Sequence, residues 1–344
     1  MNNSLDIVYT KNLPKFLHEN FFSIVITTYQ AGKLIVIGSL KGEEIFQTPI
    51  SLKKPMGVSL QGKKMAVACF DEIRFFSANE GIHEVINQKH NSEYDKAFLQ
   101  RATYFTGNLD VHDIEFGQGL LWGVNTIMSC IGVYDINYSF RPKWKPNFIS
   151  KISPEDHCHL NGMALEDKVP KYATALSQTN VKNGWRKNKM NSGVLMSVPK
   201  GKILLEGLSM PHSPRLHHGQ LYFLESGKGI LQCYDPKTKK KKIVYSFNTF
   251  VRGMDILGNV AVIGKSKIRE TNKEFNDLKI RSNSLNAGVI LFDLSNKAII
   301  GEINYSSTVE EIYDVKIMKD IRNPAIITDE FQLNHDIISL PGNK

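Results

Sequence analysis

The chain is poor in the features that mark secreted, membrane-bound and cysteine-based metal proteins. Its 344 residues include only four cysteines, Cys69, Cys130, Cys158 and Cys233, and no two of them form a CxxC pair. No apolar stretch approaches the roughly 18 residues that would span a membrane. The N-terminus, "MNNSLDIVYTKNLPKFLHENFF", lacks the basic start and apolar run of a signal peptide. We therefore expect a cytoplasmic protein that does not bind membranes and whose thiols are free and mostly buried.

Elements that recognise nucleic acids and phosphates are also missing. The sequence contains no zinc-finger spacing, no aromatic strand of the RNA-binding type and no helix-turn-helix pattern. A GxxxxGK[ST] phosphate loop and a GxSxG serine elbow are absent too. The formal net charge is +9, but part of it lies in "DPKTKKKKIV" (235–244), which is typical of a solvated hairpin turn. We expect no nucleic-acid partner, whereas small anions remain candidate ligands.

What the sequence does contain is a repeat. The segments "PMGVSLQGKKMAVACFDEIRFF" (55–76) and "PHSPRLHHGQLYFLESGKGILQCYD" (211–235) share one plan: an apolar strand opened by a small motif, a turn, a second strand, a break and a third strand. A fourth strand follows, such as "HEVIN" (83–87) or "KIVYSF" (242–247). Four antiparallel strands per unit, at a spacing of about 40 to 60 residues, are typical of propeller blades.

Five units are complete, and a sixth is shared between the two ends of the chain. The N-terminal unit lacks a first strand, which "IYDVKIMKDIRNPAIIT" (312–328) supplies. The sequence therefore predicts one all-β domain over 1–344, a six-bladed β-propeller closed by the C-terminal strand joining the N-terminal blade. The blades are expected at about 22–50 plus 311–328, 54–88, 110–150, 159–208, 210–248 and 250–305. Helical patterns are limited to "LPKFLHEN" (13–20) and "NSEYDKAFLQRATYF" (91–105), the latter in the connection after blade 2.

The first strand of every propeller blade lines the central channel, so aligned strand starts predict a ring of side chains. Burying polar groups there without partners would cost roughly 1 to 3 kcal/mol each. Either these groups satisfy one another through water in a narrow channel, or they form a ligand site, which we favour. The ring positions, one before the small or acidic residue of each unit, are Met56, His112, Asn161, His212, Arg252 and Tyr313.

Connections between the second and third strands are expected at the same mouth of the channel. Two of them, 178–191 and 266–287, are expanded in the way that lids over a site would be. Clustered cations would concentrate anions there, and Arg252 can bind a carboxylate, sulfate or phosphate through two N–H groups. We expect a small anionic molecule or a sugar derivative as the ligand. Besides Asn161 and Arg252, the ligand-binding candidates are Tyr29, Gln30, Lys33, Asn125, Gln178, Arg186, Arg215, Glu225 and Lys265.

The ring also carries groups that could transfer protons. His112, His212 and Tyr313 are the catalytic candidates, because imidazole titrates near neutral pH. Alternatively, His112, His159 and His212 could hold a divalent metal, the one cofactor that the sequence suggests.

Two short motifs near these histidines carry further expectations. In "EDHCHLNG" (155–162), the alternation of His157 and His159 places both imidazoles on one side of an extended chain. In "DVHD" (110–113), Asp110 is expected to orient His112, and Asp113 to bond backbone at a blade junction.

Five motifs together resemble a known family. They are "TTYQAGKL" (27–34), "NTIMSCI" (125–131), "DHCHLNGMA" (156–164), "GLSMPHSPR" (207–215) and "EEIYDVKIM" (310–318). In combination they are similar to an uncharacterised bacterial family of conserved hypothetical proteins with a domain of unknown function, and the resemblance covers nearly the whole chain. "GWR" at 184–186 fits a further element of that family. The resemblance implies a propeller-like β domain and brings no established activity or catalytic residues.

Two classes of function remain open. A small-molecule-binding propeller, with lyase, isomerase or hydrolase chemistry at the mouth as one form of it, predicts that the ring residues converge around a pocket of roughly 300 to 1,000 Å³. A non-catalytic scaffold or protein-interaction propeller predicts a plugged channel and a patch on the outer face of a blade. We favour the ligand-binding form.

Overall fold

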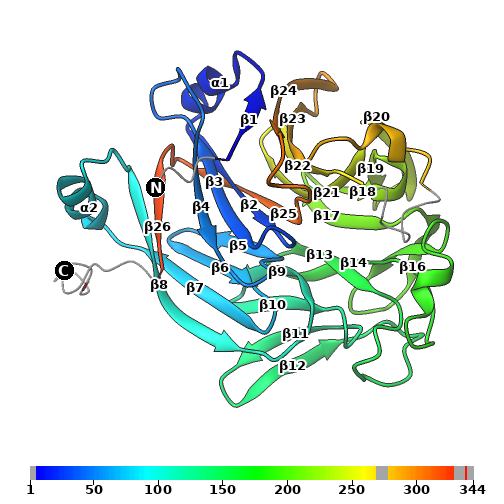
Figure 1. The fold of residues 1–344 in the computed structure, drawn as a ribbon. Coiled ribbons are helices and arrows are strands. Elements are labelled where there is room, and N and C mark those ends of the chain that lie inside the picture. Colours follow the sequence, from blue (N-terminus) through cyan, green and yellow to red (C-terminus); the bar gives the residue numbers. More distant parts are fainter. Residues whose placement is uncertain (1–4, 269–277, 329–337, 339–344) are drawn as a thin grey trace.

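The strands form six sheets arranged as blades around a common centre (Figure 1). The structure is a computed structural model, and it describes residues 5–268, 278–328 and 338. The predicted six-bladed β-propeller is confirmed. From the inner strand outward, blade 1 contains β25 (Asp314–Lys319), β2 (Phe22–Thr28), β3 (Lys33–Gly38) and β4 (Phe46–Ser51); blade 2 contains β5 (Val58–Gln61), β6 (Lys64–Ala68), β7 (Glu72–Ala78), β8 (Lys96–Phe105) and β26 (Pro324–Ile327); blade 3 contains β9 (Val111–Gly117), β10 (Leu120–Asn125), β11 (Cys130–Asp135) and β12 (Tyr138–Trp144).

The second half of the ring repeats this arrangement. Blade 4 contains β13 (Leu160–Glu166), β14 (Val169–Ala175), β15 (Gly193–Ser197) and β16 (Ile203–Leu208); blade 5 contains β17 (Pro211–His217), β18 (Gln220–Glu225), β19 (Ile230–Asp235) and β20 (Lys240–Ser246); blade 6 contains β21 (Phe250–Leu257), β22 (Val260–Ser266), β23 (Gly288–Asp293), β24 (Ala298–Tyr305) and β1 (Ile7–Tyr9). Short helices lie outside the blades: α1 (Leu13–Glu19), α2 (Ile82–His90) and the 3₁₀ turns η1 (Gly184–Lys187), η2 (Ser226–Lys228) and η4 (Arg281–Asn283).

Strands from the two ends of the chain close the ring. The inner strand β25 pairs antiparallel with β2, from Thr27 opposite Asp314 to Phe22 opposite Lys319, as predicted. The ends also pair at outer edges, because β1 adds to β24 of blade 6 and β26 runs parallel to β8 of blade 2. The segment expected in blade 1 is therefore divided, with β25 in blade 1 and β26 in blade 2 (Figure 1).

Apolar side chains fill each interface between neighbouring blades. Ile26 and Ile303 belong to the cluster between blades 1 and 6, and Val124 and Met163 to the cluster between blades 3 and 4. A sheet covered on both faces needs apolar residues at consecutive positions, which is why β2 is buried at all seven of its residues. This two-sided burial explains the near-continuous apolar runs in the sequence.

Blade 2 differs from the sequence-based expectation. The stretch predicted as its fourth strand, 83–87, lies in helix α2, and the stretch predicted as helical, 91–105, contains strand β8. Ile82 and Ile86 have helical spacing, which buries both against Leu99 and Ile327 on β8 and β26. In five consecutive residues this spacing is easily mistaken for strand alternation.

The four cysteines are free and buried, as expected. Within the described parts of the chain, no helix is long and apolar enough to cross a membrane.

Glycine alternates with a hydrogen-bonding residue where the six inner strands begin. In ring order the residues are Asp314, Gly57, Asp113, Gly162, Ser213 and Gly253. Each polar side chain accepts an amide N–H of the next inner strand: Val58 donates to Asp314 over 3.1 Å, Met163 to Asp113 over 3.0 Å and Gly253 to Ser213 over 3.1 Å. The expectation that Asp113 bonds backbone at a blade junction is therefore confirmed.

The glycines are required because the next strand lies too close for a side chain. A Cβ on Gly253 would stand 2.8 Å from Cα of Asp314, and one on Gly57 would stand 3.0 Å from Cα of Asp113. The alternation thus lets the inner strands approach until each one hydrogen-bonds to its neighbour.

Directly below this ring, a buried ion-pair network fills the channel. The Arg215 guanidinium contacts the carboxylates of Asp113 at 3.2 Å and Asp314 at 3.5 Å, and Arg215 Nε donates to the Met254 carbonyl over 2.8 Å. Lys316 pairs with Glu115 beside it. Burial raises the pKa of Asp314 to about 7, although the positive charges of Arg215 and Lys316 lower it. The channel is therefore plugged by charge, as the scaffold alternative predicted.

We predict that replacing Gly253 with alanine destabilises the protein more than the backbone angle alone explains. Gly119 is the matched control, since its φ of +76° resembles the +77° of Gly253 but a Cβ there meets nothing within 4 Å. Gly253→Ala should lower the free energy of unfolding by about 1 to 3 kcal/mol more than Gly119→Ala, because it overpacks the inner ring. Denaturant unfolding of both variants measures the difference, and equal losses would contradict the packing role of the ring.

We also predict a pH dependence of stability that originates at Asp314. Its folded-state pKa is raised above the ordinary value of 3.8, so the folded state holds a proton that the unfolded state releases between about pH 4 and 7. Stability should therefore fall as pH rises through this window. Asp314→Asn should remove this part of the dependence of the unfolding free energy on pH, measured by urea unfolding from pH 4 to 8. Asp320→Asn, at an exposed position, should leave that dependence in place. A slope unchanged in Asp314→Asn would show that another group binds the proton.

Candidate functional site at the channel mouth

Most of the predicted ring residues converge above the plug. The ring of His112 stands edge-on to Tyr313, with centroids 5.2 Å apart, and Cζ of Arg252 lies 3.5 Å from the Tyr313 centroid. Burial and the positive charge of Arg252 lower the pKa of His212, which places His212 near Arg252 in the same cluster. His112, Asn161, His212 and Tyr313 are only 4 to 7% exposed, and we call these four buried residues the floor of the mouth.

His112 and His212 are held in the same way in two blades. Nδ1 of His112 lies 3.0 Å from the carbonyl of Asp110 and 2.8 Å from Oγ1 of Thr126. Nδ1 of His212 lies 2.9 Å from the carbonyl of Met210 and 2.9 Å from Oγ of Ser226. In both cases the carbonyl belongs to the residue two positions earlier, and the hydroxyl to the residue fourteen positions later.

These contacts define the tautomer of both imidazoles. A carbonyl only accepts, so Nδ1 must carry the hydrogen, and the Thr126 hydroxyl can accept it because its own hydrogen goes to the Leu160 carbonyl. Burial and the nearby positive charges hold the pKa of both histidines well below the usual value. His112 and His212 are therefore neutral, and Nε2 of each carries a lone pair that can accept a hydrogen bond or a proton.

A left-handed backbone turn precedes the inner strand in four blades. The residues two positions before the ring residue are Lys54, Asp110, His159 and Met210, and their φ values lie between +50° and +51°. Such angles cost about 1 to 3 kcal/mol at residues other than glycine, and they persist only where the surrounding structure imposes them. The turn aims the preceding carbonyl back at the ring residue, which is how Asp110 and Met210 bind their histidines. Asp110 orients His112 mainly through this carbonyl, since its carboxylate lies 3.6 Å away.

His159 joins the mouth as the partner of Asp156. Its Nδ1 lies 2.9 Å from a carboxylate oxygen of Asp156, and its ring contacts His112 at 4.7 Å between centroids. The Trp185 indole donates to the same carboxylate over 2.7 Å, and the indole covers the His159 ring at 4.2 Å. Burial raises the pKa of Asp156, but the charge and hydrogen bond of His159 and the Trp185 bond outweigh it, so the net pKa is lowered.

His157 does not share this environment. Its Nε2 binds Glu155 at 3.1 Å, whereas His159 turns away through its left-handed backbone toward Asp156. The expected extended chain with both imidazoles on one side is therefore wrong.

The two predicted lids meet beside the mouth. Trp185 and Met190 of the 178–191 insertion pack with Ile268, Leu278 and Ile280 of the 266–287 insertion in one apolar cluster. Residues 269–277 of the second insertion lie outside the described residues. The contact fixes Trp185 over His159.

Two donors in the mouth are buried without a partner. The Tyr313 hydroxyl has none among the described residues, and neither has Nδ2 of Asn161, whose Oδ1 accepts from Thr174 over 2.8 Å. Burial raises the pKa of Tyr313 well above its usual value, so the phenol keeps its hydrogen. Tyr29 stacks on the other side of Tyr313 at 5.7 Å. A donor without a partner costs free energy, which a bound acceptor would recover.

Several ligand-binding candidates lie away from this floor. Glu225 is fully buried in blade 5, where it accepts from the Ser209 backbone and binds Lys228 at 2.9 Å. Oδ1 of Asn125 accepts from Tyr134 within blade 3. Arg215 belongs to the plug, and the far side of that plug lines a 320 Å³ cavity at the opposite end of the channel.

Other candidates are exposed or already paired. Gln30 is exposed, and Lys33 donates to Ser51 over 2.8 Å. Lys265 binds Glu302 at 2.5 Å, and Arg186 lies over the outer face of Trp185 at 4.5 Å. Gln178 lines a separate 740 Å³ cavity.

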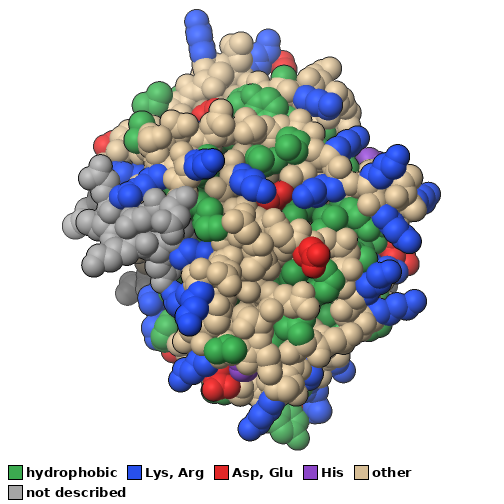
Figure 2. Space-filling view, turned by 90° about the vertical axis from the view of Figure 1, so that its right-hand side faces the viewer, with side chains coloured by type: hydrophobic (Ala, Val, Ile, Leu, Met, Phe, Trp, Pro, Cys, Tyr) green, Lys and Arg blue, Asp and Glu red, His purple; other side chains and the backbone are tan. Residues whose placement is uncertain are grey.

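Most charges at the mouth are compensated. Arg252 contacts Glu311 at 3.2 Å, and Asp156 is ionised beside His159. On the face that Figure 2 shows, Lys and Arg side chains are spread out and form no continuous patch. The suggested metal set is not assembled: in the described part of the chain, no three His, Cys, Asp or Glu side chains are arranged to hold a metal ion.

Sequence reasoning missed Asp156, Trp185 and Glu311 as parts of the site. His159 stands two residues before Asn161, as Asp110 stands two residues before His112. This shared spacing was a usable signal that His159 lies at the mouth. The role of Asp156 had no signal, because it depends on the sharp turn at residues 156–159, where Asp156 and His159 both have positive φ.

Comparisons with known proteins give the fold and a family. A family model described as "Domain of unknown function (DUF4915)" matches residues 11–327. The chain is similar to a solved structure described as "Crystal structure of Nidogen/Laminin Complex", with a TM-score of 0.54 and 12% identity, over 87% of this chain and 99% of that one. At this identity the similarity shows the propeller fold alone. No curated protein matches the chain.

We predict that His112 and His212 stay in the neutral Nδ1–H form at pH 6. Their pKa values are held well below the usual value by burial, so protonation should begin only at lower pH. Long-range ¹H–¹⁵N spectra of imidazole-labelled protein report the tautomer, with His112→Gln and His212→Gln as assignment controls. The same sample in denaturant supplies the unfolded reference. Two protonated nitrogens at pH 6 in either folded ring would refute this assignment.

Proposed function

Because the chain belongs to the DUF4915 family, which is described as a domain of unknown function, we propose a function from the geometry of the mouth alone. We infer that the protein binds a small hydroxylated, sugar-like molecule on the floor formed by His112, Asn161, His212 and Tyr313. The observation that carries this proposal is a pair of buried donors, Tyr313 Oη and Asn161 Nδ2, which have no partner among the described residues and lie beside two neutral imidazoles.

The floor offers what hydroxyl groups require. A hydroxyl both donates and accepts, and the floor provides acceptors in Nε2 of His112 and His212 together with donors in Tyr313 and Asn161. Tyr29, stacked on Tyr313, and Trp185, which covers His159, border the floor with aromatic rings of the kind that ligand pockets combine with a few polar groups. Anions fit less well, because Glu311 already neutralises Arg252 and Asp156 adds a negative charge.

The same floor can also move a proton. Asp156 binds Nδ1 of His159, so Nε2 of His159 is the nitrogen left to meet a ligand. A carboxylate that orients an imidazole is the arrangement that general-base catalysis uses. A hydroxyl bound on this floor would lie beside three imidazoles, which supports a lyase, isomerase or hydrolase step as an extension of binding.

The insertion 178–191 has to move for a ligand to enter. Trp185 covers His159, and the floor residues are nearly inaccessible with the insertion in this position. Loops that close over a site in this way exclude water and strengthen polar contacts.

The alternative, a protein-interaction scaffold, is supported by the plugged channel. The plug lies below the floor, however, so it blocks passage through the channel without filling the mouth. In the ligand-binding function, the Tyr313 hydroxyl hydrogen-bonds to the ligand. In the scaffold function, it contributes nothing to binding.

We predict that Tyr313→Phe weakens binding of a hydroxylated ligand about tenfold, the loss expected for one hydrogen bond in a buried site. A panel of monosaccharides and polyols, screened by saturation-transfer NMR and measured by calorimetry, supplies the ligand. Removing an unpaired buried hydroxyl should leave the free protein as stable as before or slightly more stable.

Tyr305 is the matched control, because its hydroxyl is also buried and has no partner in the part of the chain that the structure describes, but it lies in β24 of blade 6. Tyr305→Phe should leave affinity unchanged. If no member of the panel binds, or if both variants bind as the native protein does, the mouth is not a site for hydroxylated ligands and the scaffold function is favoured.

A further inference from the structure

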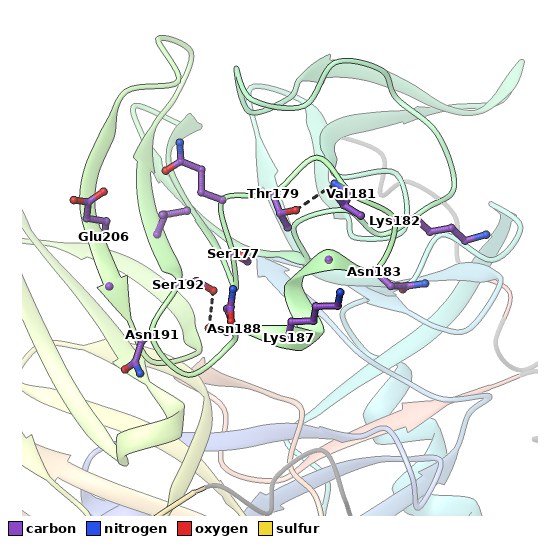
Figure 3. A pocket seen from close by; sticks show the side chains of 14 residues that line it. Ser177, Thr179, Val181, Lys182, Asn183, Lys187, Asn188, Asn191, Ser192 and Glu206 are labelled. Atoms are coloured by element: carbon purple, nitrogen blue, oxygen red, sulfur yellow. Dashed lines mark hydrogen bonds between the residues drawn. The ribbon is translucent and has the colours of Figure 1, made fainter.

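A second cavity lies on the outer side of the 178–191 insertion. Its volume is 740 Å³, which falls within the range of pockets that hold small molecules. It opens between this insertion and the edge strand β16 of blade 4 (Figure 3). No residue of the mouth floor lines it, so it is a separate site.

Many of the residues that line the cavity carry amide or hydroxyl groups. Amide side chains come from Gln178, Asn183, Asn188 and Asn191, and hydroxyls come from Ser177, Thr179 and Ser192. Two of the hydroxyls are used locally, since Thr179 accepts from the Val181 backbone and Ser192 donates to the Asn188 carbonyl. The amides are the groups that remain for a ligand.

Charge is distributed unevenly across the cavity. Lys182 and Lys187 belong to the insertion, whereas Glu206 belongs to β16 on the other side of the cavity (Figure 3). Neither lysine forms an ion pair with another described residue within 4 Å, although Lys182 lies close enough to Glu155 to lower its pKa. Two cations and one carboxylate at opposite sides fit a ligand with an anionic group at one end and hydroxyls at the other.

The wall between this cavity and the mouth is the short turn η1. Gly184 and Lys187 line the cavity, whereas Trp185 between them points to His159 and Asp156. A Cβ on Gly184 would stand 2.6 Å from Oγ1 of Thr179, so a side chain there would force Thr179 to shift. One tightly folded turn therefore presents one face to each site.

We propose that the 740 Å³ cavity binds a hydroxylated anion, a sugar that bears a carboxylate, phosphate or sulfate, with its anionic group between Lys182 and Lys187. Occupation of the cavity stabilises the insertion and so holds Trp185 over His159. The binding step does not depend on the function proposed for the mouth, whereas the effect on Trp185 links the two sites.

Calorimetry with matched probes tests the binding step. The probes are glucose, glucuronate, glucose 6-phosphate and glucose 6-sulfate, with inorganic phosphate and sulfate as bare anions. At least one sugar anion should bind about tenfold or more tightly than glucose and than the corresponding bare anion, because both ends of the cavity are then used. The preferred member of the series identifies the anionic group.

Variants of the cavity locate the binding. Lys182→Ala with Lys187→Ala should weaken the best sugar anion about tenfold or more, and Asn191→Trp, which fills the cavity from an exposed position, should abolish binding. Lys143→Ala with Lys237→Ala removes the same charge at exposed sites elsewhere and should change affinity less than twofold at 150 mM salt. Tyr313→Phe should leave this binding intact, which separates it from the mouth.

Trp185 reports the link between the sites. The chain has three tryptophans, so Trp122→Phe with Trp144→Phe leaves Trp185 as the only indole. Titration of this variant with the best sugar anion should change Trp185 emission, and adding Lys182→Ala and Lys187→Ala should remove the change. Binding without a change in emission would overturn the link.

Three results would overturn the binding site itself. They are no binding of any sugar anion, equal binding by the lysine variant and the native protein, and binding that survives Asn191→Trp. Tighter binding of an acidic peptide than of every sugar anion would instead assign the cavity to a protein partner.

Discussion

The closest approach of the six inner strands is the constraint on which the rest of the structure depends. Glycine in every second blade lets one strand lie against the next, and Asp314, Asp113 and Ser213 use that proximity to accept an amide hydrogen bond across the junction. Because these bonds join different blades, they set the diameter of the channel. The narrow diameter brings Asp113 and Asp314 within reach of one guanidinium, that of Arg215, and the channel is plugged as a consequence.

The mouth inherits its geometry from this ring. Each ring side chain stands one residue before a junction residue, so a tightly fixed junction also fixes the side chain. The left-handed turns at Asp110 and Met210 add a second restraint, since they return a carbonyl to the histidine two residues later. Strain held in this way keeps His112 and His212 in one tautomer before any ligand arrives, which is how a preorganised site avoids ordering its groups on binding.

The repeat could be recognised in the sequence because it consists of local patterns. The residues that depart from it could not be recognised, because their roles depend on contacts between distant segments. Strand starts such as His112 and His212 could be aligned from their neighbours alone, and the structure brings them together. Arg215 and Glu225 fall in the same repeat, yet their partners come from other blades or other strands, so the pattern could not show that both carry structural charges. Helix α2 was missed for the same reason, since its burial against β26 requires the C-terminal end of the chain to reach blade 2.

The plug also explains why positive charge is compensated at the mouth and remains on the 178–191 insertion. The carboxylates of Asp113 and Asp314 compensate Arg215 below the floor, and Glu311 compensates Arg252 at its edge, so little net positive charge reaches the mouth. Selection at the floor then depends on the positions of donors and acceptors. The lysines of the 178–191 insertion lie outside this compensated region, on the far side of η1. The sequence suggested that positive charge gathers at one anion-binding site. The structure instead has little net charge at the floor and keeps positive charge on the insertion. Trp185 and Lys187, two residues apart on one turn, belong to these two different environments.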